Sequence, residues 1–200
     1  MYGLVNRSVQ CFVEDTYGCA VWDAVVREVR MEFRDFEAML SYDDALTGQV
    51  IEAAAINLKR DRESLLEDLG AYLVTHKNME TVRRLMRFGG HTFEDFLLSL
   101  DDLHDRVKLA VPDLELPQMS LKQVSGEQYK IICEFTEAGF GAVMLGMVRA
   151  LADDYGALVL LDLEAEASGR LSREVLSVNL LEASFATGRS FTLGGEAVPT

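Results

Sequence analysis

Three histidines are the side chains in this 200-residue sequence best suited to bind a metal ion or to transfer a proton near neutral pH. His76 and His91 lie in polar stretches, so both are expected to face solvent. His104 differs, because it falls within a stripe of apolar residues. A lone histidine in that setting is most often a core residue whose ring is hydrogen-bonded. The alternative is an axial iron ligand, because a neutral imidazole that faces an apolar cavity can bind iron while the surrounding hydrocarbon accommodates a porphyrin.

The residues around His104 predict one long amphipathic helix. Thr92 and Asp95 fit the capping box that begins many helices, and Pro112 ends the pattern. Between them, apolar residues recur in steps of three and four, which is the spacing of one helix face. The residues of this face are Phe93, Leu97, Leu100, His104, Val107 and Val111. We therefore expect His104 to point inward from a continuous helix that runs from Thr92 to Val111.

Motifs for catalysis are scarce in the sequence. Neither a glycine-rich phosphate loop nor a Gly-x-Ser-x-Gly nucleophile motif is present. Adjacent acids such as Asp101 and Asp102 are typical of solvated helix faces. An enzyme that uses a thiol, with Cys133 near His104, stays open as an alternative, although only the presence of both residue types supports it. The sequence therefore favours a protein that is not an enzyme.

Composition and charge restrict the partners and the compartment. The formal net charge is -14 at pH 7, and a surface so acidic repels nucleic-acid phosphates and anionic lipid headgroups. Three cysteines, without zinc-site spacing, do not form a disulfide framework, which favours a reducing compartment. No apolar run reaches the roughly 18 residues that span a bilayer, and the first residues lack the pattern of a signal peptide. We expect a cytoplasmic protein that binds neither nucleic acid nor membrane.

Hydrophobic periodicity divides the chain into a helical part and a mixed part, which is typical of the α+β class. Before Pro117, helical spacing dominates, with breaks at Gly18 and at polar stretches around residues 41–44 and 59–61. The elements predicted after Pro117 are a strand over residues 129–135, a helix over 139–154 and a hairpin with strands over 157–166 and 171–182. We expect a single domain over residues 1–182, helical to about 112 and mixed from about 118, followed by a loose tail over 183–200.

Three segments together resemble the heme nitric oxide/oxygen-binding (H-NOX, HNOB) family, which includes the sensor domain of soluble guanylate cyclase. The opening Met-Tyr-Gly-Leu-Val-Asn-Arg, running on to Tyr17-Gly18, is similar to that family's first helix. The segment from Phe93 to His104 is similar to its proximal-histidine helix, and the segment from Val111 to Pro117 is similar to the loop beyond it. The resemblance covers residues 1 to about 182.

The resemblance implies a fold and a cofactor. The fold is a helical N-terminal subdomain followed by a four-stranded antiparallel sheet with helices, with heme b bound between the two. His104 would be the proximal iron ligand, and Pro117 would press against the porphyrin and help to distort it. The gas-binding side would be lined by apolar side chains alone, namely Val5, Val9, Leu73 and Ala142 or Val143.

The sequence departs from the family where the heme propionates are bound. The family carries a Tyr-x-Ser-x-Arg motif on the strand before the late helix, and the matching positions here are Cys133, Phe135 and Glu137. None of the three family residues is retained. An arginine makes charge-assisted bonds to a carboxylate, whereas a glutamate repels one, so heme would be held more weakly.

After this departure, two functions stand ahead of the thiol enzyme. The first is a bacterial nitric oxide sensor that binds NO and CO, and not O2, at ferrous heme, because no hydrogen-bond donor on the gas side would hold O2. Signal transduction would follow from release of the His104 tether, read by a separate histidine kinase or cyclic-di-GMP enzyme. The alternative is a heme-free interaction module that has kept the fold and lost the cofactor.

Overall fold

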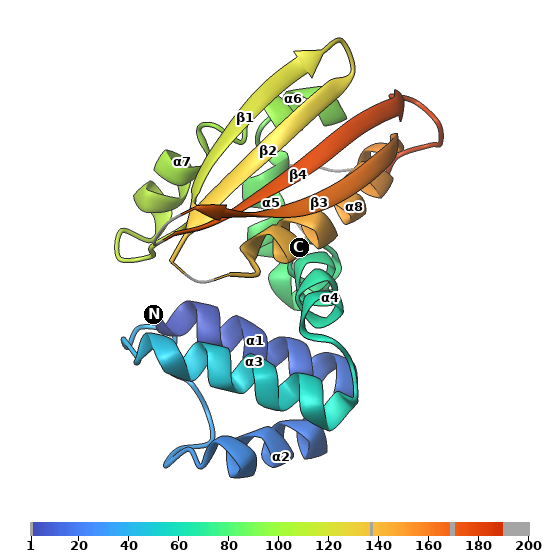
Figure 1. Ribbon diagram of the computed structural model, residues 1–200. Helices are drawn as coiled ribbons and strands as arrows, with labels where there is room; N and C mark the ends of the chain where they lie inside the picture. Colours follow the sequence, from blue (N-terminus) through green and yellow to red (C-terminus); the bar gives the residue numbers. More distant parts are fainter. Residues whose placement is uncertain (1, 137, 169–170, 190–200) are drawn as a thin grey trace, which may run out of the picture.

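The computed structural model describes residues 2–136, 138–168 and 171–189, except for the side chains of residues 167 and 168. Figure 1 shows two parts, one above the other: α1 to α4 form the lower part, and a four-stranded sheet with α5 to α8 forms the upper part. The α+β class predicted from the sequence is confirmed, with the helices of the lower part preceding the strands along the chain.

The lower part follows the predicted helices closely. Its helices are α1 (Gly3–Tyr17), α2 (Cys19–Val29), α3 (Asp44–Leu58) and α4 (Arg62–Thr75). The predicted breaks coincide with helix ends. Gly18, with a φ of 93°, lies between α1 and α2. Asp43 and Asp61 are the N-caps of α3 and α4, and each carboxylate accepts a backbone N–H at 2.8 Å. Among the described residues, no helix combines the length and the apolarity needed to cross a bilayer.

The prediction of one continuous helix from Thr92 to Val111 is wrong. The capping box of Thr92 and Asp95 is present, but the segment forms two helices, α6 (Phe93–Leu98) and α7 (Leu103–Ala110), after the short η1 (Lys77–Met79) and α5 (Glu80–Arg87). Between α6 and α7, the backbone N–H groups of Leu100, Asp102 and Leu103 donate to the carbonyl three residues earlier, whereas in an α-helix they would donate to the carbonyl four residues earlier. The Asp101 carboxylate turns outward and accepts the Leu121 N–H at 2.7 Å, which ties this turn to the sheet.

The sheet is antiparallel throughout, with strand order β1-β2-β4-β3. Its strands are β1 (Gln118–Ser125), β2 (Gln128–Phe135), β3 (Leu158–Ser168) and β4 (Leu171–Glu182). The predicted hairpin of the last two strands is confirmed, although part of its turn, residues 169 and 170, lies outside the described residues. The hydrophobic pattern had not predicted β1, which only the family resemblance implied.

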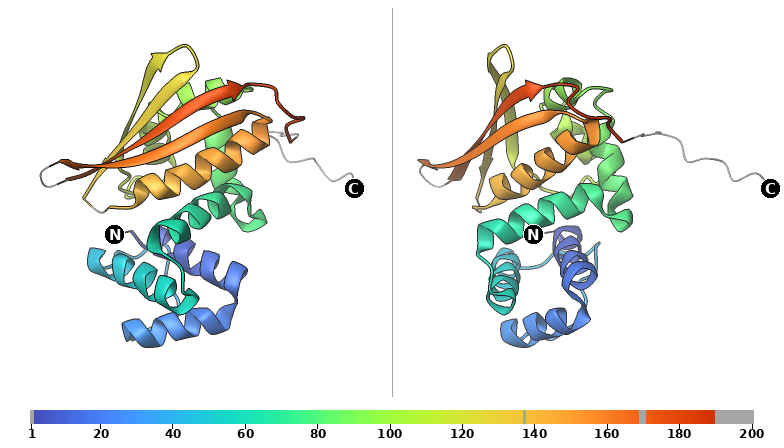
Figure 2. Two further views of the ribbon diagram at one scale, coloured as in Figure 1. Left: turned by 45° about the vertical axis from the view of Figure 1, so that its right-hand side comes forward. Right: turned by 90° about the vertical axis from the view of Figure 1, so that its right-hand side faces the viewer.

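Helix α8 (Phe140–Tyr155) covers one face of the sheet and packs on its other side against α4. The views in Figure 2 show α4 lying between α8 and the other lower helices. The two helices approach so closely that a Cβ on Gly70 or on Gly146 would lie under 3.0 Å from backbone atoms of the opposite helix. This backbone contact joins the upper and lower parts.

Of the tail predicted after Glu182, the structure describes residues 183–189. Residues 183–189 form no helix or strand, but two of their backbone N–H groups bond to the end of α8. Ala186 donates to the Gly156 carbonyl at 3.0 Å, and Arg189 donates to the Asp154 carbonyl at 2.8 Å. The weak hydrophobic pattern of this segment did not reveal these backbone bonds.

Candidate functional site

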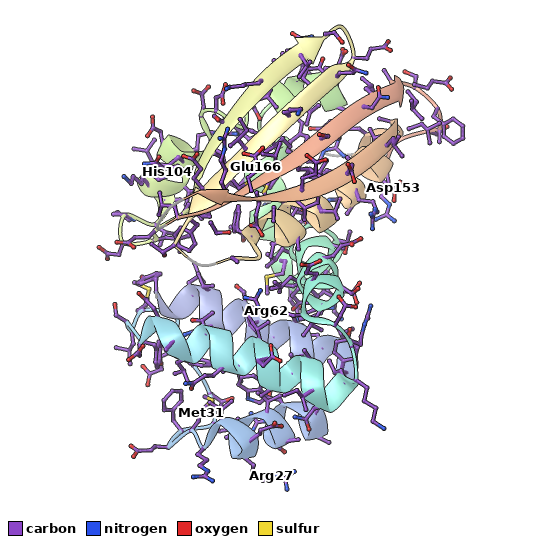
Figure 3. All side chains as sticks on the ribbon, viewed as in Figure 1. Arg27, Met31, Arg62, His104, Asp153 and Glu166 are labelled. Carbon is purple, nitrogen blue, oxygen red and sulfur yellow. The ribbon has the colours of Figure 1, made fainter. Side chains whose placement is uncertain are left out.

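His104 is the second residue of α7 and is only partly buried (Figure 3). Its Nδ1 atom is nevertheless enclosed, and no described residue forms a hydrogen bond with it. A buried polar atom without a partner costs about 1–3 kcal/mol, and the side chains of Asn6, Arg106 and Arg173 each hold one such atom as well. His104 is therefore a side chain of a type that can bind a metal, with one ring nitrogen that no described residue satisfies.

The helix that carries His104 is held in place by its neighbour Arg106. The Arg106 guanidinium donates through Nη2 to the Ser99 carbonyl at 2.7 Å and through Nη1 to the Leu85 carbonyl at 3.4 Å. Burial lowers the pKa of Arg106, and the nearby Asp102 opposes that shift. Arg106 thus ties α7 to the ends of α5 and α6. Sequence reasoning missed it, because a single arginine among apolar positions of a helix gives no signal of its own.

A cleft lies where the lower part meets the loop before β1 and the end of β2. It encloses about 270 Å³ and is lined by Tyr2, Ser41, Asp44, Asp113, Glu115, Phe135 and Thr136. Phe135 is the one predicted site residue among these. Pro117 is buried two residues beyond Glu115, directly before β1. Three carboxylates border the cleft, so its rim is acidic.

Cys133 does not line the cleft described above. It is buried on the face of β2 that packs against α8, opposite Glu174 on β4. Burial raises the pKa of the Cys133 thiol to about 12, and the Glu174 carboxylate adds to the shift. Phe135 shares this face of the strand, two residues on. Glu137, the third predicted position, lies outside the described residues.

Glu174 fixes the loop between β2 and α8. It is 8% exposed, and its two carboxylate oxygens accept the Gly139 N–H at 2.9 Å and the Gly141 N–H at 2.7 Å. A carboxylate at a helix N-terminus satisfies free backbone N–H groups and is stabilised by the helix dipole. Sequence reasoning missed Glu174, although a glutamate at an inward position of β4, in step with Leu176 and Val178, was a usable signal.

The apolar residues predicted for the gas side lie on three helices. Val5 is partly buried and Val9 is buried on α1, and Leu73 is partly buried on α4. Ala142 and Val143 are buried in the first turn of α8, where the Val143 backbone meets α4. None of the five lines the 270 Å³ cleft. Their role toward a ligand therefore stays a prediction.

The burial of Cys133 predicts a thiol that does not react in the folded protein. We expect iodoacetamide at mildly alkaline pH to alkylate the exposed Cys19 and to leave Cys133 unmodified, because the thiolate is the reactive form and the Cys133 pKa of about 12 keeps it scarce. Peptide mass spectrometry after timed alkylation checks this, with a urea-unfolded sample as the control in which all three cysteines react. Rapid labelling of Cys133 in the folded chain would return the thiol enzyme to consideration.

Comparison with known sequences gives a consistent family. The sequence profile of the HNOB family, described as haem-NO-binding, matches residues 2–161. Soluble guanylate cyclase 89Da of Drosophila melanogaster is 23% identical over 155 residues, which are 78% of this chain and 23% of that protein. Soluble guanylate cyclase gcy-33 of Caenorhabditis elegans is 23% identical over 184 residues, which are 90% of this chain and 19% of that protein. The chain spans less than a quarter of the length of these relatives.

Solved structures of H-NOX proteins share the fold of this chain. A mutant of Cs H-NOX that carries an unnatural amino acid superposes with a TM-score of 0.78 at 15% identity, covering 94% of this chain and 100% of that one. An oxygen-binding H-NOX domain related to soluble guanylate cyclases, solved as its oxygen complex, superposes with a TM-score of 0.71 at 15% identity, covering 95% and 100%. The profile match over most of the chain and the shared fold lead to one conclusion: the chain belongs to the haem-NO-binding (H-NOX) family, related to the sensor domain of soluble guanylate cyclase.

Proposed function

We propose that this chain is a heme-based gas sensor that binds NO and CO, and not O2, and that signals to a separate partner protein. The observation that supports this most is the match to a family described as haem-NO-binding, and the enclosed Nδ1 of His104, which has no hydrogen-bond partner among the described residues, is consistent with it. A ring nitrogen of His104 would bind the iron, and the second would take an outer hydrogen bond, as in most metal-bound histidines. Ferrous heme would supply an iron centre with an open position for a diatomic gas.

The residues present fit the cofactor in their chemistry. Among the described residues, no group of three or more His, Cys, Asp or Glu could hold a metal ion, whereas heme iron needs a single axial histidine and takes its other ligands from the porphyrin. Pro117 is buried directly before β1, and we propose that it contacts the ring, as the family resemblance implies.

The side chains proposed for the gas side favour ligands that need no hydrogen bond. Val5, Val9, Leu73, Ala142 and Val143 carry no donor. Bound O2 carries partial negative charge and is retained by a donor such as a tyrosine hydroxyl, whereas NO binds ferrous iron tightly without one. A pocket of low polarity therefore shifts the balance toward NO and CO.

Helix α7 is the element that would transmit the signal. Among the described residues, the buried side chains of Leu103 and Val107 anchor α7 in the core. Arg106 anchors it further by its hydrogen bonds to the ends of α5 and α6. A tether from His104 to iron would add a restraint, and its loss on gas binding would let α7 take a second position. A histidine kinase or a cyclic-di-GMP enzyme in the cytoplasm is the partner we propose, and we assign this chain no catalytic role.

The gas selectivity is tested on protein expressed with a heme precursor. We expect the ferrous protein to show a Soret band that shifts when NO or CO is added under nitrogen and that shows no stable oxygenated form when air is admitted. Absorbance spectroscopy measures both. A stable oxygenated spectrum would contradict the selectivity while leaving heme binding intact.

The second candidate function is a heme-free interaction module. Three carboxylates border the cleft, and neither Cys133 nor Phe135 can bind a propionate through charge. The same expression experiment separates the two functions, because a colourless protein that takes up no added hemin would support the module.

A further inference from the structure

Asp154, near the end of α8, is a buried carboxylate whose acceptor atoms are shared by two elements. Its side chain is 2% exposed. Its Oδ2 accepts a hydrogen bond from Arg83 Nε on α5 at 2.8 Å, and its Oδ1 lies 3.6 Å from Arg189 Nη1. Its backbone carbonyl accepts from Arg87 Nη1 on α5 at 3.3 Å and from the Arg189 N–H at 2.8 Å. A buried charge is held only where cations or donors surround it, so α5 and the segment after β4 jointly hold Asp154.

The segment after β4 fits closely onto this end of α8. We call residues 183–189 the C-terminal strap, and in the left view of Figure 2 it lies, in dark red, beside the end of α8. Gly156 has a φ of 76°, and a Cβ on it would collide with the Ala186 carbonyl. A Cβ on Gly188 would lie 2.8 Å from the Asp154 carbonyl. The strap therefore rests directly on the backbone of α8, where its two backbone hydrogen bonds hold it.

Helix α5 also contacts the helix that carries His104. The two arginines of α5 that hold Asp154 flank Leu85, and the Leu85 carbonyl accepts a hydrogen bond from Arg106 Nη1 of α7 at 3.4 Å. Arg106 lies two residues beyond His104. Hydrogen bonds and ion pairs thus run from α7 through α5 to Asp154 and the strap. Such a set of contacts transmits a displacement if one member has two positions, and the strap, which is neither helix nor strand, can leave α8 by local opening.

We propose that the C-terminal strap is a releasable element that responds to the position of α7. The inference rests on the proposed function for the event that moves α7, which is the loss of the tether from His104 to iron. A shift of α7 would act on α5 through Arg106 and draw the α5 arginines away from Asp154. The carboxylate and carbonyl of Asp154 would then lose the geometry that binds Arg189, and the released strap would be free to bind the partner protein.

The first arm of the test needs no heme. Hydrogen–deuterium exchange of the peptides that cover the strap is measured by mass spectrometry in wild type, Arg83→Met and Arg84→Met. Arg84 is the matched control, because it is the next residue of α5 and its Nε donates to Glu80 at 3.3 Å, so its variant removes the same charge beside the cluster. The melting temperature and the exchange of peptides from α2 report any general loss of stability.

The second arm needs no substitution at the strap. Ferrous, heme-loaded wild type and Arg106→Met are measured with and without NO under nitrogen, and the Soret band shows whether NO has bound. The exchange of the strap is then compared at equal heme content.

We expect Arg83→Met to accelerate exchange in the strap about tenfold, in line with the loss of a charge-assisted hydrogen bond, and Arg84→Met to match wild type. NO should accelerate exchange in the strap of wild type and leave α2 unchanged, and Arg106→Met should bind NO without this response. Equal strap exchange in the three heme-free proteins, or a Soret shift with no change in the strap, overturns the role of the strap while the proposed function stands. A wild-type chain that takes up no heme overturns both.

Discussion

Replacing Gly146 with alanine is expected to lower the free energy of unfolding by about 3 kcal/mol, the upper part of the usual range for overpacking. The added Cβ would lie under 3.0 Å from the Glu67 carbonyl and from the Ala71 backbone nitrogen on α4. Both contacts are backbone, so no side chain can rotate away and the two helices must separate. Urea unfolding, followed by far-UV circular dichroism, measures the loss.

Gly48 provides a matched control inside another helix. It lies within α3, and no atom comes within 4 Å of a Cβ built there. Gly48→Ala should therefore raise stability by about 0.5–1 kcal/mol, because alanine is the better helix former. If Gly146→Ala and Gly48→Ala both had the unfolding free energy of the wild type, this would contradict close backbone packing between α4 and α8.

Replacing His104 with glycine is expected to reduce heme affinity at least about 100-fold, because even the loss of an outer-shell partner costs metal sites 10–100-fold. The fold should survive, since the ring makes no hydrogen bond to a described residue and glycine removes only a partly buried side chain. Added imidazole should restore the Soret band, because it can enter the space of the lost ring and bind the iron.

His91→Gly serves as the control for this experiment. His91 is exposed, close before α6, so its loss should leave heme content unchanged. Heme content is measured by absorbance after gel filtration, with and without imidazole. Equal heme content in His104→Gly and wild type would show that another group binds the iron.

The helices of the lower part were predictable because local signals coincide there. Gly18 permits a positive φ, and Asp43 and Asp61 cap helices whose apolar spacing is regular. The break between α6 and α7 was not predictable, because the apolar spacing continues across it. At the break, the Asp101 carboxylate accepts a backbone N–H of β1, and this contact is distant in sequence.

The candidate site divides in the same way. His104 was accessible to sequence reasoning, because an imidazole within an apolar face is a local anomaly. Arg106 was not, since it donates to carbonyls of other elements, at Ser99 and Leu85. Glu174 was predictable only in part. The alternation of buried residues along β4 indicates its inward position, but its partners on the β2–α8 loop are distant in sequence.

The bond between His104 and iron can be observed directly by resonance Raman spectroscopy of the ferrous, heme-supplied protein. We expect a low-frequency iron–nitrogen stretching band that shifts when the protein is grown with ¹⁵N-histidine, persists in His91→Gly and vanishes in His104→Gly. An isotope-sensitive band that persists in His104→Gly, or its absence from the wild type, would contradict ligation of heme iron by this histidine.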